Sequence, residues 1–181
     1  GTEFPDEFVV VGGHIDSWDG ATGATDNASG CATTMEAARI LMTAGVKPKR
    51  TIRFMLWSGE EQGLLGSKAW VQQNPKEAQN ISAVFVHDGG TNYVSGITCT
   101  PAMQPDFEKV FADILDLDER TPFAISTVDT MRPRGGSDHV PFIAAGIPGC
   151  PGPGLPASVA ACPTADAAAD AADITTHATG N

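Results

Sequence analysis

Residues 51–61, TIRFMLWSGEE, join an apolar run directly to two adjacent glutamates, Glu60 and Glu61. The run from Thr51 to Trp57 is short and rich in β-branched, aromatic and aliphatic side chains, which predicts a buried β-strand. Two like charges at the end of such a strand repel each other and lose hydration energy. The sequence therefore poses the question of which function offsets this cost.

Two further stretches have the same character as the first. They are FVVVGG at residues 8–13 and ISAVFVH at residues 81–87, and both predict buried strands. The predicted strands are separated by segments with helical periodicity. An alternation of strands and helices favours an α/β fold, with three layers arranged around a mainly parallel sheet.

Three helices are expected, over residues 27–45, 61–74 and 105–118. The first begins at a cap formed by Asn27 or Ser29 and ends at a glycine. The second is stopped by the proline that follows it. The third carries apolar residues at helical spacing and a proline in its first turn.

The chain of 181 residues has the length of one domain. Helical and strand periodicity stops near its end, so we expect a folded core over residues 1–148 and an atypical Pro/Gly/Ala-rich tail over residues 149–181. Cys150 and Cys162 flank a Pro/Gly-rich loop in this tail. A disulfide between them would indicate an oxidising compartment, and two free thiols are the alternative.

The formal net charge is −11 and there are no basic clusters, which argues against a nucleic-acid partner. No apolar run approaches the roughly 18 to 20 residues that a membrane-spanning helix needs. The chain enters a strand almost at once and shows no signal-peptide pattern. We expect either a trimmed mature protein or a piece of a longer chain.

Acidic and imidazole side chains follow every predicted strand. In parallel α/β folds the ligands gather outside the carboxyl ends of the strands, so these groups are expected at one edge of the sheet. Divalent cations would stabilise such a cluster, and a mixed imidazole and carboxylate set suits zinc, with manganese or cobalt as substitutes. The groups concerned are His14, Asp16, Asp26, Glu60, Glu61, Asp88, Asp138 and His139.

Five motifs occur in the order found in the M28 family of dizinc exopeptidases: GGHIDSW, GATDNASG, WSGEEQGLLGS, HDGG and SDHVPF. The chain resembles that family over residues 5–148, and most of all its plasma glutamate carboxypeptidase branch. The resemblance implies the zinc-exopeptidase fold, of the phosphorylase/hydrolase-like type and truncated here. It also implies a cis peptide bond between Asp26 and Asn27.

The resemblance implies two bound zinc ions and a role for each polar residue. The implied ligands of one zinc are His14 and Asp88, those of the other are Glu61 and His139, and Asp26 bridges both. Glu60 is implied as the general base, and Asp16 as the acid behind His14. The glutamate pair would then be one base and one ligand.

The function expected from the resemblance is hydrolysis of peptide bonds near a free terminus, through a metal-bound water with Glu60 as base. Aminopeptidase, dipeptidase and carboxypeptidase activities all remain open, as do side-chain preference and oligomeric state. The alternatives are a non-catalytic peptidase-like binding module, an inactive fragment, and another amidohydrolase such as a glutaminyl cyclase. The family and the disulfide alternative favour an extracytoplasmic location.

Four residues outside these roles have competing interpretations. We expect His87 to be structural, because neighbouring residues of a strand point to opposite faces. Trp18 either shapes a substrate pocket or packs, and Tyr93 either forms a pocket wall or has no role in a pocket. His177 is similar to part of a His/Thr-rich substrate-loop motif of the same branch.

Overall fold

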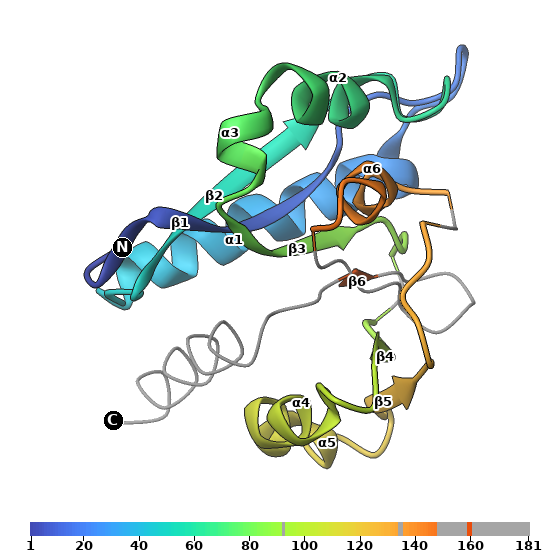
Figure 1. Ribbon diagram of the computed structural model, residues 1–181. Helices are drawn as coiled ribbons and strands as arrows, with labels where there is room; N and C mark the ends of the chain where they lie inside the picture. Colours follow the sequence, from blue (N-terminus) through green and yellow to red (C-terminus); the bar gives the residue numbers. More distant parts are fainter. Residues whose placement is uncertain (92, 134–135, 148–158, 161–181) are drawn as a thin grey trace.

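The central sheet of the protein is built around β1 (Phe4–His14), which lies between β2 (Arg50–Trp57) and β3 (Ile81–His87) (Figure 1). The computed structural model describes residues 1–91, 93–133, 136–147 and 159–160. β1 runs parallel to both neighbours, as the sequence predicts. The short strand β6 (Val159–Ala160) adds to the free edge of β3 in the antiparallel direction.

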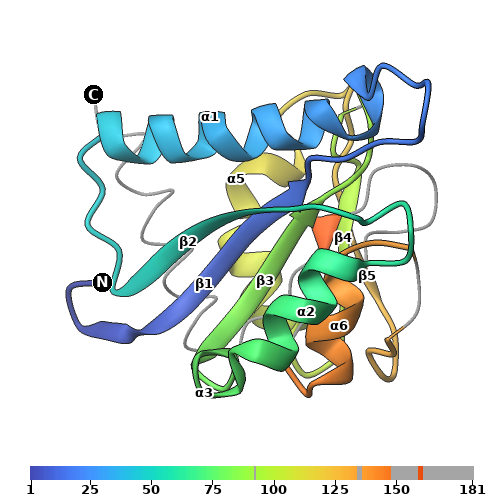
Figure 2. The ribbon, with the colours of Figure 1, turned by 90° about the horizontal axis from the view of Figure 1, so that it is seen from above.

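Helices cover both faces of this sheet (Figure 2). α1 (Ser29–Thr43) lies on one face, and α2 (Leu65–Gln73), α3 (Pro75–Ala78) and α6 (His139–Ala144) lie on the other. The result is the three-layer α/β arrangement that the alternating pattern of strands and helices predicts.

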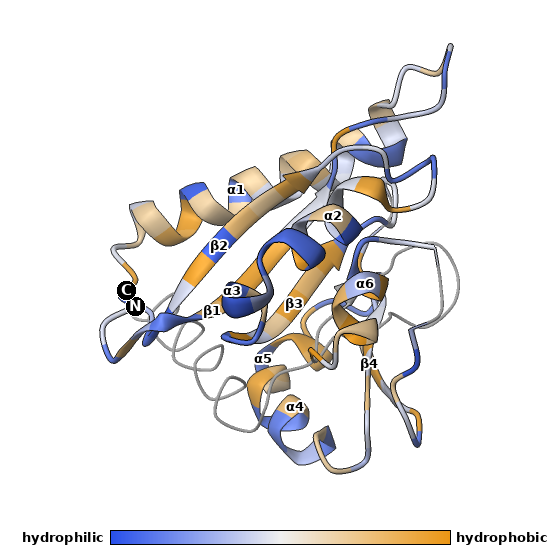
Figure 3. Ribbon diagram, turned by 45° about the horizontal axis from the view of Figure 1, so that its top comes forward, coloured by the Kyte–Doolittle hydropathy of each residue, from blue (hydrophilic) through white to orange (hydrophobic). Residues whose placement is uncertain are grey.

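The main core lies between the sheet and the α2, α3 and α6 layer. Val10, Val84 and Val86 are fully buried there, and Val10 stands opposite Val84 in the parallel register. The ring of Phe142 from α6 packs 5.7 Å from Trp57 and 5.8 Å from Trp70, measured between ring centroids. Figure 3 shows hydrophobic residues along β1 and β3 and hydrophilic residues over α3.

The opposite face, beneath α1, is less completely covered. Residues of β1, β2 and β3 and of α1 line a cavity of about 460 Å³ on this face. Phe54 of β2 remains 36% exposed and Leu56 39% exposed.

A second, smaller unit follows β3. β4 (Gly96–Cys99) and β5 (Ala124–Thr127) form a parallel pair, and α4 (Gln104–Val110) and α5 (Ala112–Leu115) connect them. Its core contains Ile97, Cys99 and Phe107, and the Phe111 ring lies 5.7 Å from Phe107 and 5.2 Å from Phe123. The sequence reading did not predict either strand of this pair.

The first helix agrees with its prediction at both ends. A π-helical turn, η1 (Ala24–Ala28), precedes α1, and the Asn27 side chain accepts a hydrogen bond from the Gly30 N–H at 3.1 Å. After α1, Gly45 adopts φ 68°, a conformation that a glycine tolerates and that ends the helix.

The predictions for the other two helices were partly wrong. The second helix begins at Leu65 rather than Glu61, because Gly63 (φ 109°) and Leu64 (φ 62°) adopt left-handed backbone conformations that an α-helix excludes. The predicted helix 105–118 is divided at Phe111, whose φ of −96° and ψ of 8° leave the helical region.

Most of the predicted tail lies outside the described residues, and so do Cys150 and Cys162, whose pairing the sequence leaves open; Val159 and Ala160 are the described part of the tail. Cys31 and Cys99 are buried free thiols. Within the described part of the chain, no helix has the length and apolar character needed to cross a membrane.

The aromatic contact between α6 and the sheet predicts a clear stability difference. Phe142→Ala should lower the free energy of unfolding by about 3–5 kcal/mol, because it empties a fully buried site between two tryptophans. Phe54→Ala, on the partly exposed face, is the matched control and should cost less than half as much. Urea denaturation followed by tryptophan fluorescence measures both, and equal losses would contradict this account of the core.

Candidate metal centre

The three central strands end at the same edge of the sheet and carry the candidate site there (Figures 1 and 2). His14 is the last residue of β1 and stands opposite Trp57, the last residue of β2. Asp88 follows β3 directly, and Glu60 comes shortly after β2. The parallel direction of the strands therefore gathers groups that are far apart in the sequence.

His14 lies at the centre of the cluster and is 1% exposed. Its Nε2 atom is 3.1 Å from Asp26 Oδ1 and 3.1 Å from Asp88 Oδ1. Its other ring nitrogen, Nδ1, lies 3.1 Å from the carbonyl oxygen of Asp16. That contact fixes the ring and leaves Nε2 facing the two carboxylates.

His14, Asp26 and Asp88 form a compact set of ligand atoms. Within the described part of the chain they are the one group of three His, Cys, Asp or Glu residues whose ligand atoms all lie within 4.8 Å of one another. One imidazole nitrogen and two carboxylates form a donor set that suits zinc. The site thus fits a divalent cation by chemistry and by spacing.

Asn27 holds the loop that carries Asp26. The Asp26–Asn27 peptide bond is cis, as the resemblance implied. Asn27 is buried, and its side-chain amide donates to the His87 carbonyl oxygen at 2.8 Å. A Cβ atom at Gly30 would collide with the same carbonyl, so only glycine allows this close approach of α1 to the end of β3. Asp26 and Asp88 are thereby tied to one framework.

Asp16 supports the glutamate pair. Its carboxylate accepts the Glu60 N–H at 3.1 Å and the Glu61 N–H at 3.3 Å, one on each oxygen. The same carboxylate lies 3.6 Å from Nδ1 of His14. Asp16 thus contacts both the histidine, as expected, and the turn after β2, which the sequence reading missed.

The two glutamates occupy different environments. Glu60 is 8% exposed and its Oε2 lies 3.9 Å from His14 Nε2, whereas Glu61 is only half-buried. Burial raises the pKa of Glu60 to about 7, with the charges of Asp88, Asp138 and Glu61 acting in the same direction and His14 opposing them. Burial and the charge of Asp26 raise the pKa of Glu61. The adjacent carboxylates therefore diverge in exposure and in surroundings.

The electrostatics of the cluster centre on His14 and Asp88. Burial lowers the pKa of His14, but the hydrogen bond and charge of Asp88 outweigh burial and raise that pKa to about 9. Burial raises the pKa of Asp88, but His14 and Ser137 outweigh it, so the net shift is downward. Without a cation, a proton on His14 offsets part of the negative charge.

The segment Ser137–His139 approaches the cluster from the start of α6. All three residues are buried, and the charge of Asp138 acts on the ionisation of Glu60. His139 is 2% exposed and lies outside the three-residue cluster, as does Glu61. His177 lies outside the described residues. The structure therefore brings three of the five predicted ligands into one compact set.

Three of the remaining residues are placed by the structure. His87 lines the cavity beneath α1 and burial lowers its pKa, in agreement with a structural role. Trp18 is 60% exposed on the loop that follows His14. The Cys31 thiol, which the sequence reading left without a role, donates to the His14 carbonyl oxygen at 3.0 Å. The sequence signal for this contact was the position of Cys31 in the first turn of the predicted helix.

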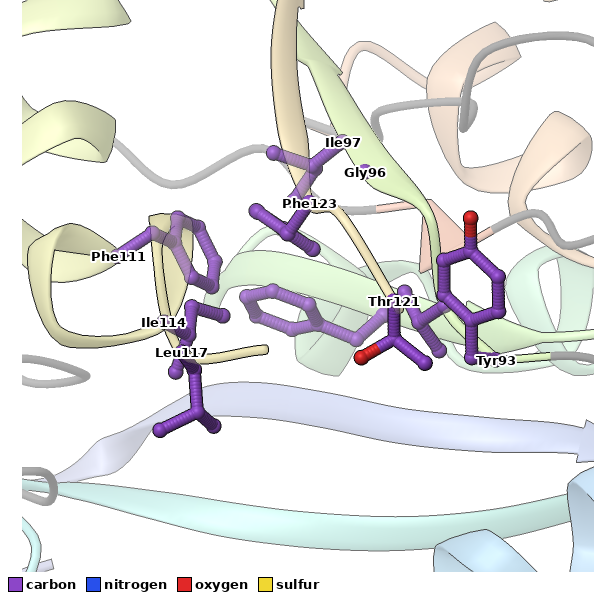
Figure 4. A pocket seen from close by; sticks show the side chains of 10 residues that line it. Tyr93, Gly96, Ile97, Phe111, Ile114, Leu117, Thr121 and Phe123 are labelled. Atoms are coloured by element: carbon purple, nitrogen blue, oxygen red, sulfur yellow. The ribbon is translucent and has the colours of Figure 1, made fainter. Parts of the chain in front are cut away.

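Tyr93 forms part of a pocket wall, one of its two predicted roles. The pocket has a volume of about 350 Å³ and lies between β3, β4 and α5. Figure 4 shows Phe111, Phe123 and Ile114 around its apolar interior, with the Tyr93 hydroxyl at one side. None of its lining residues belongs to the polar cluster.

The sequence of the chain is similar to those of known peptidases. The family model for peptidase family M28 matches residues 1–176. The chain is 33% identical over 149 residues to carboxypeptidase Q of Xenopus laevis and to that of Homo sapiens, and each alignment covers 82% of this chain. The chain spans only 30% of the length of these relatives.

Solved structures agree on the fold. A peptidase M28 precursor from Shewanella amazonensis superposes with a TM-score of 0.68 at 24% identity, covering 97% of this chain and 42% of that one. LapB from Legionella pneumophila superposes with a TM-score of 0.58 at 23% identity, covering 97% and 50%. At these identities the structural match establishes the fold.

The five motifs resemble M28 sequences in their order along the chain, and the family model and the curated relatives match most of its length. The chain belongs to peptidase family M28, a family of zinc-dependent metallopeptidases.

Proposed function

We propose that this chain carries the catalytic centre of a dizinc exopeptidase, which hydrolyses peptide bonds near a free terminus with Glu60 as the general base. The observation that carries the proposal is the contact of one buried imidazole nitrogen with two carboxylates, at 3.1 Å each, beside a buried glutamate. Membership of family M28 supports the reaction class, and the curated relatives are named carboxypeptidase Q.

In this proposal the chain holds two cations through five side chains. His14 and Asp88 would hold one, and Glu61 and His139 the other. Asp26 would serve both, since its carboxylate has two oxygens and stands 63% exposed at the mouth of the cluster. Two divalent cations about 3.5 to 4 Å apart lower the pKa of a water between them and polarise the substrate carbonyl.

Glu60 would move the proton. Peptide hydrolysis requires a group that takes a proton from the attacking water and gives one to the leaving amine. Burial raises the pKa of Glu60 to about 7 in the cation-free chain, and positive charge bound beside it would lower that pKa and leave the carboxylate ionised and able to accept a proton. Asp16 would hold this carboxylate in place, since it accepts hydrogen bonds from the backbone N–H groups of Glu60 and Glu61.

An inactive fragment or a non-catalytic binding module is the rival function, and one observation favours it. Within the described part of the chain, three of the five proposed ligands form one compact set, and Glu61 and His139 lie outside it. Measurement of peptide hydrolysis distinguishes the exopeptidase from an inactive fragment or a binding module. A panel of terminal peptides together with an N-terminal glutamine substrate also separates peptidase from cyclase chemistry, and its free termini distinguish aminopeptidase from carboxypeptidase action. An extracytoplasmic location remains part of the proposal.

Glu60→Gln should separate chemistry from metal binding. The amide keeps the shape of the side chain but cannot accept the proton, so we expect zinc content to stay within error and kcat to fall by about 10²–10⁴-fold. Glu119→Gln, an exposed glutamate remote from the site in sequence, is the matched control and should change neither quantity. Turnover by Glu60→Gln at the wild-type rate would eliminate Glu60 as the base.

Asp26→Ala should remove both cations, because its carboxylate is proposed to bind the two together. His139→Ala should remove only one, and His177→Ala, which replaces a histidine outside the proposed set, should remove none. Metal analysis of the three variants by mass spectrometry, after exposure to zinc and desalting, gives the stoichiometries. If His177→Ala lost a zinc and His139→Ala kept both, the ligand assignment of His139 would be wrong.

A further inference from the structure

Asp138 is a buried carboxylate to which the proposed reaction gives no task. It is 0% exposed and stands at the N-cap position of α6. Aspartate at this position normally accepts a hydrogen bond from the first turn of its helix, a contact worth about 1 kcal/mol. Here the side chain makes no such bond. Something other than helix capping explains its orientation.

The carboxylate of Asp138 lacks well-placed hydrogen-bond donors in the part of its surroundings that the structure describes. Among the described residues, neither carboxylate oxygen has a hydrogen-bond partner of good geometry. The Ser67 hydroxyl lies near enough to lower the pKa of Asp138, yet it donates to the Leu64 carbonyl oxygen at 3.3 Å. A buried carboxylate without donors is costly unless a positive charge stands nearby.

The groups that Asp138 faces belong to the candidate metal centre. Asp138 directly precedes His139 in the chain, and it interacts electrostatically with His14, Asp88 and Asp16. The charge of Asp138 in turn raises the pKa values of Glu60 and Cys31. Four acidic side chains thus share one small region with the imidazole of His14.

A bound divalent cation would turn the repulsion among these carboxylates into a net attraction toward the cation. Repulsion among the carboxylates disfavours the empty site, whereas each additional negative charge attracts a cation held at the cluster. Asp138 lies outside the compact set of ligand atoms, and the five proposed ligands do not include it. Its proposed effect on the cations is electrostatic and acts at short range.

We propose that Asp138 is a positioning residue for the metal centre, which binds no cation itself but supplies the buried negative charge that makes the His14–Asp26–Asp88 cluster hold divalent cations tightly. This inference rests on the proposed function. It gives a role to Asp138, which the sequence places in the cluster but to which the family resemblance assigned none. Groups that hydrogen-bond the ligands of a metal typically change its affinity by 10- to 100-fold, and we expect a buried charge without such a bond to act at the lower end of that range.

The test compares Asp138→Asn with wild type and with Asp129→Asn, an exposed aspartate that serves as the matched control. Competition with a chromogenic chelator at pH 7.5 measures the zinc Kd, and the visible spectrum of the cobalt-loaded protein reports the ligands. We expect Asp138→Asn to weaken zinc binding at least tenfold and to leave the cobalt spectrum unchanged. Asp138→Glu, which keeps the charge, should recover at least part of the affinity, and Asp129→Asn should match wild type.

Thermal unfolding in chelator separates this role from a structural one. Removal of an unsatisfied buried charge should leave the melting temperature of the metal-free protein unchanged or raise it, while zinc should stabilise the variant less than wild type. A structural carboxylate would instead lower the melting temperature in both states. If Asp138→Asn does not fold, Asp138→Ala takes its place, and failure of both would overturn the proposal.

Two further outcomes distinguish failure of the proposed metal centre from failure of the proposed role of Asp138. Wild-type protein that binds no zinc would overturn the proposed metal centre itself. Wild-type protein that binds zinc, with an equal Kd for Asp138→Asn, would overturn only the role of Asp138. A changed cobalt spectrum in Asp138→Asn would show that Asp138 is a ligand, which also contradicts the proposal.

Discussion

The structure depends on one constraint, the meeting of several carboxylates with the buried imidazole of His14 at the carboxyl edge of a parallel sheet. His14 stands 3.1 Å from two of these carboxylates, and Asp16 bonds the turn that carries Glu60 and Glu61. Buried like charges at this spacing destabilise a fold unless a cation binds among them. The sheet, the Asn27 amide and Gly30 hold the groups together despite that repulsion.

The sheet and the centre of the site follow from local sequence patterns. Each central strand is a short apolar run, and the polar residue after it, such as Asp88, reaches the shared edge because the strands are parallel. The late start of α2 could not be predicted, because Leu64 adopts a left-handed conformation that its residue type disfavours. The helix is divided at Phe111, whose ring packs against Phe107 and Phe123, and the apolar periodicity of the segment gives no signal of this break.

Contacts between distant segments account for what sequence reasoning missed in the site. Asn27 was expected to cap a helix, and it does so while also bonding the end of β3. Asp138 was expected near a ligand, but its lack of a capping bond is visible only in three dimensions. Membership of family M28 supplies the reaction class. The chain spans only 30% of the length of its carboxypeptidase Q relatives, so its substrate remains a proposal.

The most direct test of the central claim is the metal content of the wild-type chain. The protein would be purified without chelator, exposed to zinc, desalted and measured by native mass spectrometry. We expect about two zinc ions per chain, because the proposed site shares five ligands between a co-catalytic pair. A chain that folds, as judged by circular dichroism, and retains no zinc would contradict it.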